Sequence, residues 1–330
     1  KPMNDHFNTH QISWSYLTKR FSIYFVLILL IIISSLINPN FLSANNISNV
    51  ARQISVTTIL AFGETILIIC GLLDLSSGSV LALSGLLSVA SYKATGSMLL
   101  AILIAVGIAV FCNLLSAIIV TRFSVPSFIA TLAMQEMARG SALLFSKGQN
   151  IYQIGDYTIL GQGSIGPIPI PILFLIGFML ITWYTLNQTR FGRSLYAIGG
   201  NQEAAQASGI AVNRIKTLAF LFNGLIVGIA GVLFMSRVNA GLPNGGINYE
   251  FQALTSSIIG GTSFSGGVGT AGGTLVGALI VGFLNNIMNL ASVNSYMQQI
   301  VRGAIIALAV MYDISAKSRQ SKLFARLKLK

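Results

Sequence analysis

The sequence predicts an all-α polytopic membrane protein with about ten transmembrane helices. Two observations support this fold class: 54% of the 330 residues are hydrophobic and only 8% are charged, and long apolar stretches recur along the whole chain. A soluble domain of this length needs a larger polar surface. We divide the chain into a cytoplasmic arm (1–20), a transmembrane domain (21–314) and a basic cytoplasmic tail (315–330).

Apolar stretches mark the predicted crossings, which follow one another with short polar connections. They are residues 21–38, 48–73, 79–92, 98–121, 126–146, 172–187, 217–236, 252–261, 273–290 and 297–313. The eighth stretch is the weakest, because a crossing helix usually needs about 20 apolar residues. Residues 39–47, 147–167 and 237–251 are predicted to be outer loops, and the even number of crossings places both termini in the cytoplasm.

The formal net charge of +12 results from 20 basic and 8 acidic residues. Most of the basic residues lie in segments that we assign to the cytoplasm, above all 189–217 and the tail. This bias is the positive-inside pattern of membrane proteins, so we expect contact with membrane lipid and no nucleic-acid partner. The few acidic residues form no dense intramembrane series, which argues against a proton pump. No cleavable signal sequence is expected.

Two polar, glycine-containing breaks interrupt the apolar stretches, at 74–78 and at 260–273. Non-helical backbone at membrane depth is tolerated only where protein buries it or where it lines a cavity. We therefore expect both breaks to lie inside the protein, facing a transport path or a seam between two chains.

Two stretches in the first half of the chain resemble two in the second. Residues 124–128 (SVPSF) resemble 292–296 (SVNSY), and 134–140 (MQEMARG) resemble 297–303 (MQQIVRG). The two pairs have different offsets, so chance is the competing explanation. Two halves of five helices would be inverted relative to each other, because five is odd. Transporters often place a substrate path at the interface of such halves.

Polar side chains within or beside the apolar stretches are candidates for lining a transport path, because such residues are often functional. The candidates are Asp74, Ser76, Ser77, Asn223, Asn285 and Asn286. Each has a structural alternative. Asp74 could cap a helix that starts at Ser76 or Ser77, and the amides could join helices to each other. Glu64, Glu136 and Arg139 are also ionisable, but Glu136 and Arg139 are three residues apart and could pair.

The polar segment 189–217 lies between two predicted crossings and contains a short predicted helix. Gly199 and Gly200 precede Asn201, which is a good N-cap, and Glu203 places an acid in the first turn. Ala204 and Ala205 favour helix, and Gly209 can end it in a left-handed conformation. A helix of about two turns on the cytoplasmic face would be a contact for another protein. The alternative is a loop that carries positive-inside charges.

Other motifs argue against catalysis and against bound cofactors or metals in this chain. Cys70 and Cys112 are isolated in apolar stretches, so we predict buried core residues. His6 and His10 are the only histidines and lie in the polar arm. The GxGxxG pattern at 267–272 follows no strand, so we interpret it as close packing rather than dinucleotide binding. No GxxxxGK[ST] motif is present, so we predict no ATP hydrolysis by this chain.

Four motifs in this order resemble the ribose-type permease family, the membrane subunits of bacterial ABC sugar importers. They are LDLSSGS at 73–79, TRFGR at 189–193, AIGGNQEAA at 197–205 with SGI at 208–210, and IGGTSFSGG at 259–267. The resemblance covers roughly residues 40–313. It implies an inner-membrane protein that moves a small sugar, with a ribose-like pentose expected, from a periplasmic binding protein to the cytoplasm.

The resemblance also implies partners. It implies a second permease chain, expected to be identical, and partner subunits that bind ATP and Mg²⁺. Residues 199–209 would then be the coupling helix that docks into a groove of the ATPase. Two alternatives stay open: a heteromeric permease for another small sugar or an autoinducer-2-like ligand, and a secondary sugar transporter. The secondary transporter would need a site for a coupling ion, and Asp74 is the only carboxylate that we consider a candidate ligand.

Overall fold

The computed structural model describes residues 14–328, with side chains described for 23–311 and 313–315. Most of the predicted arm, including His6 and His10, therefore lies outside the described residues. The described chain is a bundle of helices, and its single sheet is one hairpin in which Ser164 pairs with Pro169 and Ile165 with Ile168. The predicted all-α polytopic class is confirmed.

The elements follow the predicted crossings closely. They are α1 (Trp14–Ile37), η1 (Pro39–Leu42), α2 (Ala44–Ile69), α3 (Ser77–Thr95), α4 (Met98–Arg122), α5 (Ser127–Ser146), η2 (Gly155–Thr158), α6 (Ile159–Gln162), β1 (Ser164–Ile165), β2 (Ile168–Pro169), α7 (Ile170–Gln188), α8 (Arg190–Gly200), α9 (Gln202–Ala207), α10 (Val212–Val238), α11 (Tyr249–Ile259), α12 (Ala271–Leu290) and α13 (Ser295–Lys328).

Six of the described helices are long and apolar enough to cross a membrane: α2, α4, α7, α10, α12 and residues 295–315 of α13. The helices α3 and α5 have 19 and 20 residues but are less apolar, and α11 has only 11 residues. The count of ten crossings is therefore not confirmed by length and hydropathy alone. The predicted eighth crossing is the short helix α11, as its weak signal indicated.

Local capping explains where several helices begin. Ser43, Ser97 and Thr270 each accept a hydrogen bond from the backbone N–H three residues later, at 3.3, 3.3 and 3.0 Å. These bonds satisfy N–H groups that the first helical turn leaves without a partner. Each cap follows a turn, so the sequence directly sets the starts of α2, α4 and α12.

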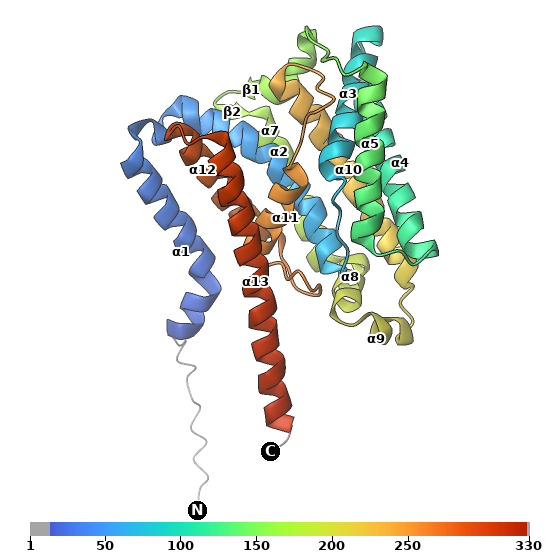
Figure 1. Ribbon diagram of the computed structural model, residues 1–330, viewed down its shortest axis with the longest axis vertical. Coiled ribbons are helices and arrows are strands. Elements are labelled where there is room, and N and C mark those ends of the chain that lie inside the picture. The colour runs from blue at the N-terminus through green and yellow to red at the C-terminus, as the bar shows by residue number, and fades with distance from the viewer. Residues whose placement is uncertain (1–13, 329–330) are drawn as a thin grey trace, which may run out of the picture.

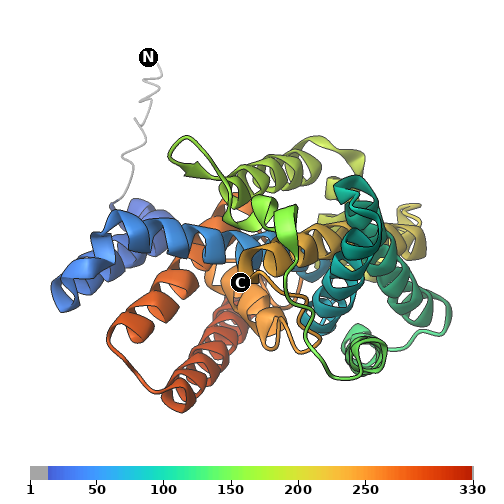
Figure 2. The ribbon, with the colours of Figure 1, turned by 90° about the horizontal axis from the view of Figure 1, so that it is seen from above.

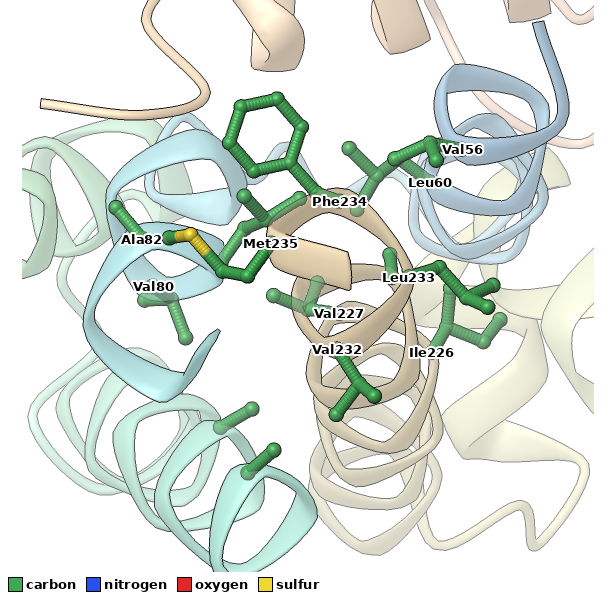
Figure 3. Close-up of a cluster of buried hydrophobic side chains, with 14 of the residues drawn as sticks. Val56, Leu60, Val80, Ala82, Ile226, Val227, Val232, Leu233, Phe234 and Met235 are labelled. Atoms are coloured by element: carbon green, nitrogen blue, oxygen red, sulfur yellow. The ribbon is translucent and has the colours of Figure 1, made fainter. Parts of the chain in front are cut away.

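The core forms where α10 packs against α2, α3 and α4. Figure 3 shows side chains of α2, α3 and α10, among them Leu60, Val80 and Leu233, gathered in this cluster. Gly228 lets α10 approach α4 closely, because a Cβ there would lie 2.7 Å from the Cα of Val106. Gly277 plays the same part where α12 meets α11, against backbone atoms of Ser256 and Gly260. Close packing at small residues holds these helix pairs together.

The helices α8 and α9 and the C-terminal end of α13 lie at one end of the bundle, which Figure 1 shows at the bottom. The loop 260–270 also lies there, because the Tyr196 hydroxyl of α8 donates a 2.8 Å hydrogen bond to the Gly269 carbonyl. The expectation that the break at 260–273 lies inside the protein holds for Thr262 and Ser263, which are buried. That the break faces a transport path or a seam stays a prediction. This loop turns the chain at the end of the bundle, between α11 and α12.

A further non-helical segment inside the bundle is 239–248, which corrects the expectation of an outer loop at 237–251. After α10, this segment runs back along α3, and Ala240, Gly241, Pro243, Gly245 and Gly246 are buried. Its small residues permit this approach: a Cβ on Gly241 would lie 3.2 to 3.3 Å from side chains of Leu86, Ile151 and Val89. Figure 1 shows that α11 then begins well inside the bundle, as α3 does after residues 70–76.

Candidate functional site

The starts of α3 and α11 meet inside the bundle. A Cβ on Gly78, the second residue of α3, would overlap the Glu250 carboxylate and the Gly246 carbonyl oxygen. Gly246 has a φ of +68°, which favours glycine, and a Cβ there would lie 2.8 Å from the Gly78 carbonyl oxygen. Two glycines therefore allow two broken segments, far apart in sequence, to join end to end.

Asp74 organises the first of these helix starts. Its Oδ1 accepts hydrogen bonds from the Ser76 backbone N–H (2.7 Å) and from the Ser76 hydroxyl (2.6 Å). Its Oδ2 accepts a 2.7 Å hydrogen bond from Asn223 Nδ2 of α10. The same Asn223 amide donates to Asn113 Oδ1 of α4 at 3.1 Å. Asp74, Ser76 and Asn223 therefore form one buried network that links the break to α10 and α4.

Two further carboxyl groups lie beside this network. Glu64 of α2 is fully buried and its Oε1 accepts a 3.3 Å hydrogen bond from the Ser77 hydroxyl. Glu250 of α11 is 4% exposed, and its carboxyl group lies against Gly78 at the start of α3. The Oε2 atom of Glu64 and the Oε2 atom of Glu250 each lack a hydrogen-bond partner. The amino ends of α3 and α11 are positive ends of helix dipoles, which favour carboxylates at these positions.

Arg139 of α5 anchors the second broken segment. Its Nη1 donates hydrogen bonds to the carbonyl oxygens of Pro243 (2.7 Å) and Gly245 (2.9 Å). These carbonyls belong to non-helical backbone inside the bundle, where each needs a donor from the protein. Among the described residues Arg139 makes no hydrogen bond with Glu136, although the Glu136 charge acts on its guanidinium, and its hydrogen bonds go to the 239–248 segment.

A cavity of about 660 Å³ lies beside α11, between α12 and α13, with Val26 of α1 at its edge. Its walls are mostly apolar, but several polar side chains line it: Asn248, Gln252, Asn285, Gln299 and Arg302. Asn285 is 5% exposed, and its Oδ1 has no hydrogen-bond partner. A cavity of this size with a few converging polar groups is typical of small-molecule sites. Amides and a guanidinium are suited to the hydroxyl groups of a sugar.

The neighbouring amide has a different environment. Asn286 of α12 and Asn46 of α2 form a reciprocal pair, with Nδ2 to Oδ1 distances of 2.9 and 3.1 Å. Both amide groups are thus used between the two helices. Asn286 joins α12 to α2, and Asn285 faces the cavity.

At the α8–α9 end, the predicted short helix is confirmed. Asn201 caps α9, with its Oδ1 accepting a 2.9 Å hydrogen bond from the Ala204 N–H. Gly209 follows the helix with a φ of +85°. Gly200, Asn201, Glu203, Ala204 and Gly209 are exposed. These residues form a polar surface of small side chains at this end of the bundle.

Two of the predicted surface residues lie underneath instead. Ala205 is 5% exposed and packs with Leu195, Ile198 and Val212 of its own chain. Gly199 is held against the backbone of Ile69 and Gly267, which are themselves joined by a 2.9 Å hydrogen bond. Ala205, expected with the rest of 199–209 to enter a groove of the ATPase, therefore lies on the face of α9 that turns toward α8 and α10, and this part of the expectation is corrected.

The helix α8 is an additional helix that the sequence did not predict, although local signals for it exist. Thr189 caps it by accepting a 3.0 Å hydrogen bond from the Gly192 N–H, and Leu195 and Ile198 recur at helical spacing on its buried face. Burial raises the pKa of Tyr196, so its hydroxyl remains a proton donor to the Gly269 carbonyl. Asp313 of α13 accepts hydrogen bonds from Phe264 N (2.9 Å) and Ser263 Oγ (3.2 Å). The loop 260–270 thus connects α8, α2 and α13.

Among the described residues, no group of three or more His, Cys, Asp or Glu side chains is placed to hold a metal ion. Cys70 and Cys112 are buried and are not joined in a disulfide, as predicted for core residues.

Comparisons with known proteins agree with the sequence motifs. Residues 46–310 match the family described as "Branched-chain amino acid transport system / permease component". The chain is 39% identical to the ribose import permease protein RbsC of Haemophilus influenzae, over 88% of this chain and 91% of that protein. It is 38% identical to RbsC of Bacillus subtilis, over 87% and 90% of the two chains. It is 35% identical to the D-allose transport system permease protein AlsC of Escherichia coli, over 89% and 91%. No solved structure matches the chain.

Proposed function

This chain belongs to the ribose-type ABC sugar permease family, and we propose that it carries a ribose-like pentose across the bacterial inner membrane. It is the permease subunit of an importer and not itself a catalytic enzyme. The observation that carries the choice of sugar is its near full-length similarity to ribose import permeases. The sugar arrives from a periplasmic binding protein and leaves into the cytoplasm.

The path of the sugar runs beside the junction of α3 and α11. The 660 Å³ cavity next to α11 supports this route, because its polar side chains, Asn285 among them, can hydrogen-bond hydroxyl groups. The buried network of Asp74, Ser76, Ser77 and Asn223 holds the helix starts in place beside it. Tight binding is not required of the path, since the binding protein captures the sugar.

The exposed surface of α9 is the contact for the ATP-binding subunit. Asn201 and Glu203 organise the helix start, and Gly200, Ala204 and Gly209 present little side-chain bulk to a groove. Ala205 and Gly199 transmit the contact inward, because they pack on α8, α10 and the end of α2. ATP and Mg²⁺ bind to the partner subunit, whose closure would move α9 and, through α8 and loop 260–270, the helices around the path.

The transmembrane topology has ten crossings in two inverted halves, α1–α5 and α7 with α10–α13. Matching elements support the repeat: α2 and α10 are each followed by a non-helical segment and then by α3 or α11. The turns before α5 and α13 each contain a serine with positive φ, Ser124 at 56° and Ser292 at 54°. Both termini and α9 are cytoplasmic in this arrangement, and two copies of the chain form the path together.

An uptake experiment tests the function. A strain without its own ribose uptake would express this chain with its ATPase and binding protein, and uptake of labelled ribose, allose and arabinose would be measured. We expect ribose uptake that stops on ATP depletion and continues with a protonophore. The opposite energy dependence would show a secondary transporter. Uptake of another sugar but not of ribose would contradict the proposed substrate and leave the proposed mechanism unaffected.

The geometry of Asp74 argues against the secondary transporter. Both of its carboxylate oxygens already accept hydrogen bonds from Ser76 and Asn223. A coupling ion would have to compete with these donors. The heteromeric alternative is tested separately, by purifying the tagged chain with its ATPase and determining whether a second, different permease chain is present.

A further inference from the structure

The loop 260–270 joins α8 to the end of α2. Its Gly267 N–H donates a 2.9 Å hydrogen bond to the carbonyl of Ile69, the last residue of α2. Its Gly269 carbonyl accepts a 2.8 Å hydrogen bond from the Tyr196 hydroxyl of α8. Through this loop, α8 is therefore held to the non-helical segment that follows α2 and leads to α3.

Glycines bring the loop very close to both of these segments. A Cβ on Gly266 would lie 3.0 Å from the Gly199 carbonyl oxygen and 3.3 Å from the Cα of Gly71. A Cβ on Gly267 would lie 2.9 Å from the backbone nitrogen of Gly200. Gly266 and Gly267 also have φ values of +82° and +77°, which favour glycine. Backbone packs directly on backbone here, so the end of α2, the end of α8 and the loop have little room to move independently.

The same loop also holds α13. Asp313 Oδ2 of α13 accepts hydrogen bonds from the Phe264 N–H (2.9 Å) and from the Ser263 hydroxyl (3.2 Å). Phe264 packs against a buried cluster of α2 and α11 side chains, and Ala309 and Val310 of α13 pack against the same cluster. Since α11 is the main helix that α13 contacts within the described chain, the loop supplies its link to α8.

We propose that the loop 260–270 is a rigid clasp that joins α8 to α13, and that Asp313 and Tyr196 are its two positioning residues. The helix α8 continues into α9, which the proposed function assigns to the ATP-binding subunit. The helix α13 carries Arg302, which lines the 660 Å³ cavity. The clasp therefore transmits movement of α9 to a wall of that cavity. This inference rests on the proposed function, from which it takes the ATPase contact at α9 and the sugar route beside α11.

The alternative is a loop that only stabilises the fold. The two roles differ in their effect on ATP hydrolysis by the partner subunit. Loss of a transmitting contact lowers sugar uptake per ATP hydrolysed, because the ATPase still binds and still works. Loss of stability lowers the amount of folded protein, so that uptake and ATP hydrolysis fall together.

Reversible cross-linking tests the clasp at its α13 side. In a chain with Cys70→Ala and Cys112→Ala, the changes Ser263→Cys and Asp313→Cys remove the hydrogen bonds to α13. A short bis-methanethiosulfonate reagent then joins the two positions until a reducing agent cleaves it. Ribose uptake and ATP hydrolysis are measured in proteoliposomes that contain the ATPase, with the binding protein added.

We expect uptake per ATP hydrolysed to fall about tenfold or more in the reduced form and to return to within about twofold of the background chain after cross-linking. Normal coupling in the reduced form, a cross-linked form that stays uncoupled, or an equal fall of uptake and ATP hydrolysis would each overturn the clasp. The matched control is Ser265→Cys with Ser315→Cys, two exposed neighbours on the same loop and helix, which leaves the hydrogen bonds to Asp313 in place and should keep normal coupling.

A second measurement does not depend on sugar. Gln299 of α13 lines the cavity, so the labelling rate of Gln299→Cys by a membrane-permeant thiol reagent reports movement of that wall. Trapping the ATPase with ATP and vanadate should change this rate, and Asp313→Ala or Tyr196→Phe should abolish the change. A change that persists in both variants would overturn the clasp and leave ribose uptake intact. A change that depends on Asp313 in a chain without ribose uptake would support the clasp and overturn the proposed substrate.

Discussion

At the scale of single residues, Asn223 has the most connected position in the site. Its amide nitrogen donates to Asp74 of the first break and to Asn113 of α4. Asp74 is buried, so removing this donor leaves one of its oxygens without water or protein to bind. A buried acceptor that loses its donor costs more than the hydrogen bond itself was worth.

We therefore predict that Asn223→Leu lowers the free energy of unfolding by about 1–3 kcal/mol. The apparent melting temperature in detergent measures this effect. The control is Asn187→Leu, because Asn187 is exposed and bonds only to the Trp183 carbonyl of its own helix. Equal melting temperatures for the two variants would contradict a structural role for the network.

A second prediction at the scale of single residues concerns Gly78. We expect Gly78→Ala to destabilise the protein by about 1–3 kcal/mol, because its methyl group would overlap Glu250 and Gly246 where the two helix starts meet. Gly107→Ala on α4 is the control, since nothing lies within 4 Å of a Cβ there. That control should be neutral or stabilising by about 0.5–1 kcal/mol. Thermal unfolding of both variants distinguishes steric overlap from a general effect of glycine.

At the scale of elements, α9 presents two adjacent alanines to different surroundings. Ala204 is exposed and Ala205 is buried against α8 and α10. Substitutions at these two positions therefore distinguish an effect on partner docking from an effect on folding of the chain. A bulky residue at the first should disturb only a partner, whereas a bulky residue at the second should overpack the chain itself.

We predict that Ala204→Trp leaves melting temperature and membrane level unchanged and weakens ATPase association by about 2 kcal/mol, which is about 30-fold. Ala205→Trp should instead lower the melting temperature of the isolated chain. Co-purification with the ATPase and thermal unfolding are the two measurements. Normal ATPase binding and uptake by Ala204→Trp would exclude α9 as the coupling helix.

At the scale of the whole molecule, the topology decides which face meets which partner. The hairpin and α6 lie at the opposite end of the bundle from α9, as Figure 1 shows. Basic residues concentrate around α8 and α9 and in the tail, which favours a cytoplasmic location for that end.

We predict that Gln162→Cys is labelled by an impermeant thiol reagent added to intact spheroplasts, in the background without Cys70 and Cys112. Ser208→Cys on the α9 end and Ser321→Cys in the C-terminal part of α13 should be labelled only after the membrane is opened. Gln162 and Ser208 are both exposed, so exposure alone does not distinguish them. Labelling in the reverse pattern would invert the assignment of the two membrane faces.

The sequence by itself determined the class, most helix ends and the short helix after Asn201, because hydropathy and capping act over a few neighbouring residues. Only the tertiary structure decided that 239–248 is a buried break inside the bundle and not part of an outer loop. Its burial depends on α3 and on Arg139, which lies 104 residues before Pro243 in the chain. Asn285 and Asn286 show the same limit, since one faces a cavity and the other pairs with Asn46. Neighbouring residues on a helix point about 100° apart, so the orientation of the helix against its neighbours assigns their roles.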